Sequence, residues 1–522
     1  MEKRWDLIIV GAGSAGAALA ARLAERGRRV LLLEAGPDYR SAEMPEAWRS
    51  PNPLPAILAP EESGSLVWPD LLSSRTDAQE PRLYWRGRGA GGSSSINGQI
   101  AIRPPREDFD DWAALGCPGW GWDEVLPYFC RLENDEAFGS APYHGDSGPI
   151  PIYRMPRERW GAVDNALAMA AMEAGFAWAD DLNAPGATGV SPYPINSRDS
   201  RRVSTNDGYL EPSRSNPNLT IRGDALVNRI LFDGDRAIGV EIVAGDSVVQ
   251  EYADDVVLSA GVIHSPAILM RSGIGPADHL RELGIDIVVD LPVGEGMQDH
   301  PIAGVELPLR ADTAIQTPDD RHTNCCVRYS SNDPDGTPND MMLVSMNQAV
   351  LSMDAAETAA GAGLIGVWLN QAYSRGTVRL TSRDPRVHPE VRESMLSDER
   401  DRRRMREGIR MLAKMAALPE VTSICAFDPA KANGPLLAAL DGNDDDLDAF
   451  LLANVSDTQH GTSTCRMGAA GDPGAVVDTE CRVLGIDGLR VIDASIFPFV
   501  LRSNTNLATI MLGEYMADRL SQ

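Results

Sequence analysis

Gly11, Gly13 and Gly16 follow an apolar run at residues 7–10 and precede a helical pattern. A Gly-x-Gly-x-x-Gly turn between a strand and a helix lets backbone N–H groups approach a pyrophosphate, which lies at the positive helix N-terminus. A second apolar run at residues 30–33 ends at Glu34, where an acid accepts hydrogen bonds from an adenosine ribose. This spacing predicts a dinucleotide cofactor. A glycine turn inside an empty Rossmann domain is the structural alternative.

A second glycine-rich segment, residues 85–98, carries many backbone N–H groups and hydroxyls that suit close contact with a ligand. A flexible linker is the alternative. Ile96 and the apolar residues 100–102 argue against a linker, because linkers rarely contain such residues. We therefore expect this segment to lie against the ligand.

The composition excludes several classes of partner. The 522 residues include 48 basic and 75 acidic side chains, which gives a formal charge of −27. Such a field repels nucleic acid and anionic membranes, so neither is an expected partner. A chain of this length with 43 % hydrophobic residues can form two or more structural regions around a large core. We find no bilayer-spanning apolar run and no secretory leader, which favours a cytoplasmic protein.

The seven cysteines are an odd number without the spacing of a disulfide framework. We interpret them as reduced thiols, with a role as small buried hydrophobes as the alternative. The seven histidines are scattered, and the chain has no CxxC or HExxH motif. The sequence therefore predicts no structural metal site.

Apolar periodicity predicts where the strands and helices lie. The expected strands cover residues 7–10, 30–33, 219–222, 225–232, 237–242, 255–261 and 489–493, with 364–369 and 376–380 in a separate sheet. A helix is expected to start at residues 265–266 with Pro266 in its first turn, and others to cover 398–418 and 509–520. Residues 51–74 are interpreted as a surface loop. Cofactor-type segments at the start, middle and end predict a discontinuous cofactor domain with a second domain inserted.

Several ordered segments resemble the glucose-methanol-choline (GMC) family of FAD-dependent oxidoreductases over nearly the whole chain. Residues 87–97 resemble the first family signature, except at Ala90, and residues 261–275 resemble the second, except at Val262. The family's Gly-x-Asn-Leu-x-Asp-His segment is matched by residues 293–301. Its C-terminal catalytic region is matched by residues 460–468, 491–498 and 503–506. Within the family, the chain resembles the bacterial aryl-alcohol and 5-hydroxymethylfurfural oxidase branch.

The resemblance implies an α/β protein of the GMC fold. Its discontinuous Rossmann-like FAD-binding domain would cover residues 1–150, 195–305 and 455–522. An inserted α+β substrate-binding domain with an antiparallel sheet would cover residues 151–194 and 306–454. The FAD contacts that it implies fall on Gly11, Gly13, Ser14, Ala15, Gly16, Glu34, Ala35, Arg88, Gly91, Gly92, Ser93, Ile96, Asn97, Gly98, Val227, Ala260, Gly261, Asp493, Ala494 and Thr505.

The resemblance also implies the chemistry. The family oxidises alcohols by passing the hydroxyl proton to a base and the α-hydride to flavin N5. His460 matches the base position, and an imidazole with a pKa near 6.5 suits that role. Asn504 matches the second catalytic position, where its amide can donate to the substrate oxygen but cannot act as a base. In isolation, His460 would be a structural histidine and residues 503–506 a turn or helix cap.

Other positions refine the hypothesis. Ile96 stands where some relatives carry a histidine bonded covalently to FAD, so the resemblance implies a dissociable FAD. Gln459 replaces an aromatic residue found in many relatives, which suggests a more polar pocket. Arg502 is interpreted as a surface salt bridge rather than a carboxylate binder. Three residues are interpreted as core, with the substrate side as the alternative: Trp368, Asn370 and Tyr373.

The leading hypothesis is FAD-dependent oxidation of a small alcohol, with oxygen or another molecule accepting the electrons. The alternatives are a GMC-fold lyase with a non-redox FAD, a non-catalytic flavoprotein, and an NAD(P)-dependent Rossmann enzyme. The choice between oxidase and dehydrogenase stays open at this point.

Overall fold

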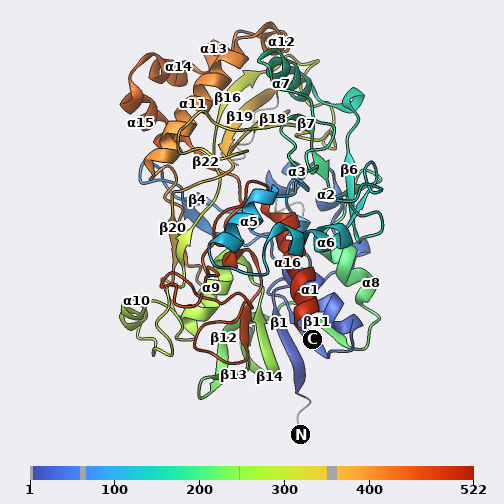
Figure 1. Ribbon diagram of the computed structural model, residues 1–522, viewed down its shortest axis with the longest axis vertical. Helices are drawn as coiled ribbons and strands as arrows, with labels where there is room; N and C mark the ends of the chain where they lie inside the picture. Colours follow the sequence, from blue (N-terminus) through green and yellow to red (C-terminus); the bar gives the residue numbers. More distant parts are fainter. Residues whose placement is uncertain (1–3, 59–65, 246, 350–360, 522) are drawn as a thin grey trace.

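The computed structural model describes residues 4–58, 66–245, 247–349 and 361–521 of the chain. Two large β-sheets lie at different heights along its long axis, with helices packed around them (Figure 1). The lower sheet contains the N-terminal strand, and the upper sheet contains strands from the middle of the chain. The protein is therefore a mixed α/β fold, as the sequence predicts.

The lower, seven-stranded sheet is built from apolar runs. β1 (Trp5–Val10) pairs in parallel with β2 (Val30–Leu33) and with the end of β14 (Ser247–Leu258). β11 (Leu219–Arg222) adds beside β2, and β23 (Leu489–Val491) adds beside β14, again in parallel. Continuous apolar runs suit these strands, because helices usually cover both faces of a parallel sheet. Segments from the start, middle and end of the chain thus form one sheet.

β14 is longer than its hydrophobic pattern indicates. Its first half pairs antiparallel with β13 (Arg236–Ala244), which pairs in turn with β12 (Leu226–Asp233). The pattern predicts a strand only from residue 255, whereas the structure begins it at Ser247. The first four residues of β14 are exposed, so no buried face marks them in the sequence. Pairing with β13, rather than burial, forms this half of the strand.

The upper sheet is antiparallel, in agreement with the expected fold. Its six strands, in spatial order, are β22 (Ser456–Asp457), β16 (Pro301–Pro308), β19 (Ala362–Leu369), β18 (Met341–Met346), β17 (Cys325–Tyr329) and β7 (Gly189–Pro192). Successive side chains of a strand point to opposite faces. Val367 and Leu369 therefore pack into the core with α7 (Ala162–Glu173) and α11 (Glu399–Ala416). Trp368 faces the other side with Val344.

The structure also contains smaller sheets. A five-stranded sheet has the order β15 (Glu295–Met297), β20 (Gly376–Arg379), β21 (Glu390–Arg392), β3 (Leu72–Ser74) and β4 (Arg82–Leu83). A three-stranded sheet contains β5 (Glu133–Asp135), β6 (Ile150–Arg154) and β8 (Pro194–Ile195), and β9 (Ser197–Arg198) pairs with β10 (Arg201–Arg202). The prediction that residues 364–369 and 376–380 share one sheet is wrong, because β19 and β20 pair with different partners.

Helices pack against these sheets. α1 (Ser14–Glu25) lies beside α16 (Thr505–Arg519), so the two ends of the chain meet (Figure 1). The longest helix, α11, has Asp398 as its N-cap, where the Asp398 carboxylate accepts from the Arg400 N–H. The remaining α-helices are α2 (Glu46–Arg49), α3 (Leu54–Leu58), α5 (Arg106–Ala114), α6 (Trp122–Leu132), α8 (Glu211–Ser213), α9 (Gly261–Arg271), α10 (Ala277–Glu282), α12 (Pro419–Thr422), α13 (Pro429–Ala432), α14 (Gly434–Asp441) and α15 (Asp444–Asn454).

Two predicted helix starts are wrong by one turn. α9 begins at Gly261 rather than at residue 265, so Pro266 lies in its second turn. Proline has no N–H to donate there, and the Thr464 hydroxyl bonds the Val262 carbonyl instead, at 2.7 Å. α16 begins at Thr505 rather than at residue 509. Thr505 and Asn506 at the start of α16 are polar and hide it from a pattern that detects apolar faces, whereas the start of α9 directly follows the buried end of β14 and is interpreted as part of that strand.

Residues 51–74 contain more structure than the predicted surface loop. Leu54 and Ile57, in the short helix α3, are 4 % and 6 % exposed, and the segment ends in β3. Residues 59–65 of this segment lie outside the described residues. A single helical turn is too short for its periodicity to be recognised in the sequence.

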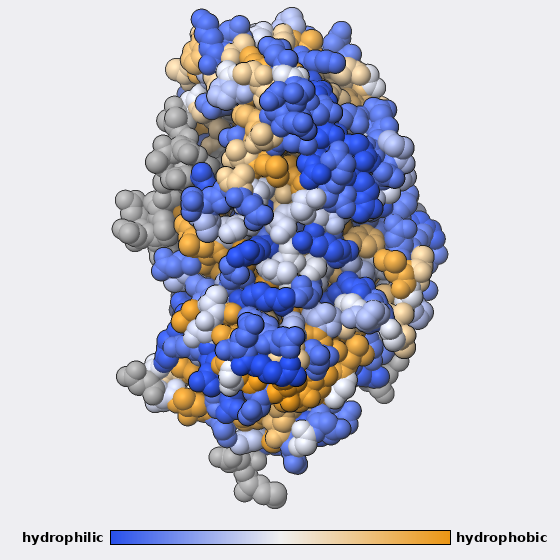
Figure 2. Space-filling model, turned by 90° about the vertical axis from the view of Figure 1, so that its left-hand side faces the viewer, coloured by the Kyte–Doolittle hydropathy of each residue, from blue (hydrophilic) through white to orange (hydrophobic). Residues whose placement is uncertain are grey.

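Figure 2 shows a face on which hydrophilic residues predominate and apolar residues are interspersed among them. Within the described ranges, no helix combines the length and the hydropathy needed to cross a membrane. All seven cysteines belong to the described part of the chain and none forms a disulfide, in agreement with the predicted thiols.

Candidate active site

A long cavity lies between the two large sheets. Its walls include the turn after β1, the glycine-rich segment at residues 85–98, the start of α9 and the start of α16. At its other end it is lined by Ile302, Val344 and Trp368, from the inner face of the antiparallel sheet. The cavity therefore connects the predicted cofactor segments with a second, more apolar compartment.

The two glycine-rich segments touch each other at one end of the cavity. Gly11 has a φ of +103°, and a Cβ added there would lie 2.4 Å from the Ser259 carbonyl oxygen. A Cβ on Gly92 would lie 2.7 Å from the Gly13 Cα, so the second segment does not tolerate a side chain at this contact. Gly13 is the N-cap of α1 and leaves the first N–H groups of this helix without a side-chain cap. These N–H groups can bind a phosphate.

Glu34 links the backbones of both segments. Its carboxylate accepts hydrogen bonds from the N–H groups of Ala12 at 2.9 Å, Gly36 at 3.0 Å and Gly89 at 2.9 Å. The side chain also lines the cavity and is 6 % exposed. Burial raises the pKa of Glu34, although these three donors act in the opposite direction. Sequence reasoning assigns this acid to a ribose and misses its contacts with the glycine backbones.

Most of the predicted FAD contacts lie in the cavity wall. These are Gly11, Gly13, Ser14, Ala15, Glu34, Ala35, Gly92, Ser93, Ile96, Asn97, Gly98, Val227, Ala260, Gly261, Asp493, Ala494 and Thr505. Three others lie behind the wall. Gly16 packs under the Gly11 carbonyl, Gly91 donates its N–H to Ala12, and Arg88 donates to the Ala35 carbonyl. These three residues support the shape of the wall.

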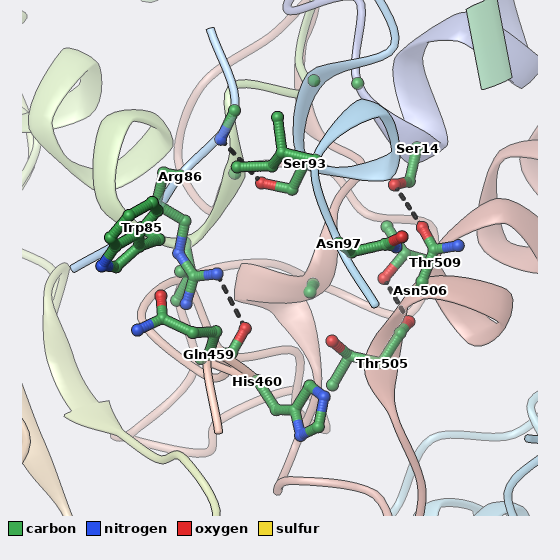
Figure 3. A pocket seen from close by; sticks show the side chains of 18 of the residues that line it. Ser14, Trp85, Arg86, Ser93, Asn97, Gln459, His460, Thr505, Asn506 and Thr509 are labelled. Atoms are coloured by element: carbon green, nitrogen blue, oxygen red, sulfur yellow. Dashed lines mark hydrogen bonds between the residues drawn. The ribbon is translucent and has the colours of Figure 1, made fainter. Parts of the chain in front are cut away.

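Two wall residues are fixed by charged or polar neighbours. The Asn97 side-chain oxygen accepts from Arg202 at 2.8 Å. Asp493 accepts from the Gly261 N–H at 2.9 Å and from the Ser265 hydroxyl at 2.6 Å, which fixes the first turn of α9. Figure 3 shows Asn97, Ser14 and Asn506 around one part of this pocket, with Gln459 and His460 facing its other part.

The two predicted catalytic side chains are in contact. The Asn504 Nδ2 atom lies 3.0 Å from the Nε2 atom of His460. The side-chain oxygen Oδ1 of Asn504 has no hydrogen-bond partner among the described residues. Both side chains line the cavity, at the junction between its cofactor segments and its apolar compartment. The side-chain contact that the family resemblance implies is therefore present.

His300 is a further histidine of the site, which sequence reasoning quotes in a motif without assigning it a role. Its Nε2 lies 2.9 Å from the Leu501 carbonyl, which can only accept, so Nε2 carries the proton and Nδ1 is an acceptor. The His300 Nδ1 is 3.0 Å from the Nδ1 of His460. His460 therefore carries its proton on Nδ1 and presents an unprotonated Nε2 toward Asn504.

Electrostatics keep His460 neutral. Burial lowers its pKa well below the usual range, and the nearby His300 and Arg86 act in the same direction. A neutral imidazole with a free Nε2 can accept a proton at pH 7. Because the Asn504 N–H points at the same atom, a hydroxyl group placed between them would meet one donor and one acceptor.

The apolar compartment includes residues that sequence reasoning interprets as core. The Trp368 ring lies 5.9 Å from the His460 ring, centroid to centroid, and lines the cavity while remaining 5 % exposed. Asn370 accepts from the Trp368 indole N–H, whereas the Tyr373 hydroxyl turns away toward Asp335. Gln459 lines the cavity and donates to Asp457. Sequence reasoning also misses several lining residues, among them Leu54, Ile57 and His322.

Arg502 forms a buried salt bridge rather than the predicted surface one. It is 1 % exposed, and its guanidinium lies 3.2 Å from Asp108 and 3.3 Å from Asp111. The Asp108 side chain is fully buried at the start of α5, so the ion pair fastens the segment before Asn504 to that helix. These ion pairs hold the Arg502 side chain away from the cavity, which it does not line.

The sequence matches one family along most of its length. Profiles described as GMC oxidoreductase match residues 5–302 and residues 372–513. The chain belongs to the GMC oxidoreductase family. It is thus an FAD-dependent oxidoreductase acting on CH–OH groups, and the comparisons do not support the lyase or NAD(P) alternatives.

Individual GMC relatives resemble the chain over its full length. It is 37 % identical to the 5-(hydroxymethyl)furfural oxidase of Methylovorus sp. (strain MP688), covering 99 % of this chain and 98 % of that one. It is 36 % identical to an oxygen-dependent choline dehydrogenase of Paraburkholderia phymatum, covering 99 % and 92 %. The crystal structure of pyridoxine 4-oxidase from Mesorbium loti superposes with a TM-score of 0.88 at 29 % identity, covering 99 % of both chains.

The cavity fits the cofactor of the family. The uncapped N-terminus of α1 offers free N–H groups to a pyrophosphate, and Gly92, where a Cβ would clash with Gly13, lies beside it. Val227 and Ala225 form an apolar wall near Glu34, as an adenosine requires. When bound, FAD would accept the hydride of the alcohol.

Proposed function

We propose that this enzyme oxidises a primary alcohol attached to a flat ring, with His460 as the catalytic base. The contact between His460 Nε2 and the Asn504 amide carries the proposal, because it creates a donor and an acceptor for one hydroxyl group. The Asn504 N–H holds the alcohol oxygen, and His460 Nε2 takes the hydroxyl proton as the hydride leaves the carbon.

The proposed ring follows from the apolar compartment. Trp368, Ile302 and Val344 provide a flat aromatic and aliphatic wall next to His460. Two relatives support this class, because 5-(hydroxymethyl)furfural oxidase and pyridoxine 4-oxidase are both named after substrates that carry a hydroxymethyl group on a ring.

A cationic alcohol such as choline fits the cavity less well. The acidic side chains in the wall are already engaged: Glu34 by three N–H groups, Asp457 by Arg75, and Asp493 by α9. Arg86, a cation, also lines the cavity, next to Gln459 (Figure 3). Among the described residues, the site therefore offers a quaternary ammonium group no free carboxylate, and Arg86 repels its charge.

We further propose that FAD is bound without a covalent link, that oxygen accepts its electrons and that the enzyme is cytoplasmic. Ile96 lines the cavity where some relatives have a histidine, and an isoleucine side chain has no atom that could bond to the flavin. Oxygen as acceptor is supported by the two oxidases among the relatives. The seven free thiols suit a reducing compartment.

Anaerobic mixing of the FAD-loaded enzyme with hydroxymethylfurfural, benzyl alcohol, pyridoxine or choline tests the proposal. We expect the ring alcohols to bleach the flavin and choline to leave it yellow, and air should then restore the colour with formation of hydrogen peroxide. The His460→Ala variant should bind FAD but bleach at least about 100-fold more slowly. Acid should release the flavin into the supernatant. Rapid bleaching by choline alone, or undiminished bleaching in His460→Ala, would contradict the proposal.

A further inference from the structure

A buried carboxylate lies behind the proposed base. The Nδ1 atom of His460 is 2.7 Å from the Thr458 hydroxyl oxygen, which is in turn 3.3 Å from the Oδ1 atom of Asp299. Asp299 is 4 % exposed, and its Oδ1 atom also accepts the backbone N–H of His460 at 2.9 Å. One hydroxyl group therefore bridges the carboxylate and the imidazole, on the side of the ring opposite Asn504.

The hydrogen positions in this bridge follow from the chemistry of its ends. A carboxylate can only accept, so the Thr458 hydroxyl donates to Asp299 and turns a lone pair toward His460. His300 also presents an acceptor to the same nitrogen. Two acceptors thus face His460 Nδ1, and both hold its proton there.

Charged and hydrogen-bonding groups surround Asp299 behind the base. Residues 84–86 contribute two of these groups: the Tyr84 hydroxyl donates to Oδ2 at 2.8 Å, and the Arg86 guanidinium lies 4.0 Å away. The remaining titratable neighbours are Asp457, which is paired with Arg75, and Glu393, and atoms of the three acids lie within 4.8 Å of one another. Burial and the charges of Asp457 and Asp299 raise the pKa of Glu393 well above its usual range, which favours its neutral form, so Asp299 and Asp457 face two guanidinium groups. Burial and the Asp457 charge raise the pKa of Asp299 to about 6, so it is largely ionised at pH 7 and above.

We propose that Asp299, acting through the Thr458 hydroxyl, is a positioning residue that fixes the proton on His460 Nδ1 and stabilises the imidazolium formed in catalysis. In that step the O–H bond of the alcohol breaks and the proton bonds to His460 Nε2, while the hydride of the carbinol carbon would pass to bound FAD, which leaves a carbonyl group. The imidazolium then has its positive charge two hydrogen bonds from a carboxylate. This inference rests on the proposed function of His460 as the base.

The chain allows replacements that change charge or hydrogen bonding and little else. In Asp299→Asn the side-chain oxygen can still accept the two backbone N–H groups, while the new amide donates to the Tyr84 oxygen. Thr458→Val keeps the shape but removes the bridging hydroxyl. Thr458→Ser keeps the hydroxyl and is the matched control.

We expect Asp299→Asn and Thr458→Val to lower the rate of flavin bleaching about 10- to 100-fold with little change in the concentration of alcohol at half-maximal rate. Thr458→Ser should retain most of the rate. Loss of the negative charge makes the imidazolium less stable, so the acid-side fall of kcat/KM should move to lower pH in Asp299→Asn. A replacement that only loosened the structure would lower the plateau without this shift.

Diethyl pyrocarbonate provides a reading that does not depend on turnover, because it modifies neutral imidazole only. The intact proteins are treated at a series of pH values, and mass spectrometry of the peptide that contains His460 gives the rate of its modification. The pH dependence of this rate should show a lower pKa for His460 in Asp299→Asn than in the wild type. Unchanged rates and pH profiles in Asp299→Asn and Thr458→Val, alongside an inactive His460→Ala, would overturn this inference alone. An active His460→Ala would instead overturn the proposed function. If Asp299→Asn fails to fold, equal rates for Thr458→Val and Thr458→Ser would overturn the inference.

Discussion

The two ring nitrogens of His460 face different partners, and this asymmetry makes the residue a base of defined orientation. Nδ1 faces acceptors, whereas Nε2 faces only the amide donor of Asn504. Burial keeps the ring neutral before catalysis, and the nearby carboxylate compensates for the charge that develops during it. Different neighbours keep the His460 ring neutral and stabilise its charged form, so separate variants can test the two effects.

Replacement of Asn504 tests the role of its amide as the hydrogen-bond donor to the alcohol oxygen. We expect Asn504→Ala to lower kcat about 10- to 100-fold, because the alcohol oxygen loses the group that holds it against His460 Nε2. Asn504→His should retain more activity, because a histidine can also donate there. Stopped-flow bleaching with one ring alcohol measures both variants. Equal rates for Asn504→Ala and the wild type would show that Asn504 does not hold the substrate.

At the scale of elements, the cavity depends on the contact between two glycine-rich segments. Gly13 and Gly92 touch without side chains, and Glu34 ties the backbones of both segments through Ala12 and Gly89. The Glu34 carboxylate thereby holds the two turns together as one wall of the cavity. Such preorganisation lowers the entropy that the cofactor loses on binding.

Glu34→Ala should therefore weaken FAD binding. The variant leaves three buried N–H groups without an acceptor, at a cost of about 1–3 kcal/mol each. We expect the Kd for FAD to rise at least tenfold, measured by titration of the deflavinated protein. Glu25→Ala, which removes an exposed acid of α1 paired only with Arg22 at the surface, is the matched control. If Glu34→Ala and Glu25→Ala bound FAD with equal affinity, the inferred role of Glu34 in holding the cavity wall would be wrong.

The sequence predicts these elements unevenly, for physical reasons. Periodicity and glycine spacing predict β1, α1 and β2, because their apolar runs are long and buried. The first half of β14 and the short helix α3 are missed, because pairing with distant strands or a single turn leaves no periodic signal. His460 and Asn504 follow from family motifs. The Asp299–Thr458 bridge joins residues 159 positions apart and depends on hydroxyl geometry that no spacing encodes.

At the scale of the whole molecule, a buried ionic network joins segments from the expected cofactor and inserted regions. His144 lies 2.6 Å from Glu133 and 2.8 Å from Asp181. Arg103 pairs with Glu133, and Arg154 pairs with Asp181 at 2.7 Å. Because the network spans residues 103–181 and belongs to no single helix or sheet, it fastens distant parts of the chain together. The proposed domain boundaries, at residues 150 and 195, pass on either side of Asp181.

This network makes stability depend on pH. Burial alone would lower the pKa of His144. The hydrogen bonds to Asp181 and Glu133 act in the opposite direction and raise this pKa above 6.5. A raised pKa means that the folded state binds the proton more tightly, so this contribution is complete below about pH 6.5 and is lost as the pH rises through the pKa of the folded protein. The lowered pKa values of Asp181 and Glu133 have the opposite sign, and their contribution is lost as the pH falls toward their range. The network should therefore stabilise the fold most strongly in mildly acidic solution.

His144→Gln should remove the alkaline side of this dependence. The amide preserves hydrogen bonding but carries no charge, so breaking the buried pairs should cost about 3–5 kcal/mol near pH 6 and less near pH 9. Thermal unfolding of the FAD-loaded protein between pH 6 and pH 9 measures this, with the exposed His388 replaced by Gln as the control. The wild type should lose stability toward pH 9 more steeply than His144→Gln. Parallel curves for the two proteins would show that His144 is neutral throughout this range and that the network holds the molecule together by hydrogen bonds alone.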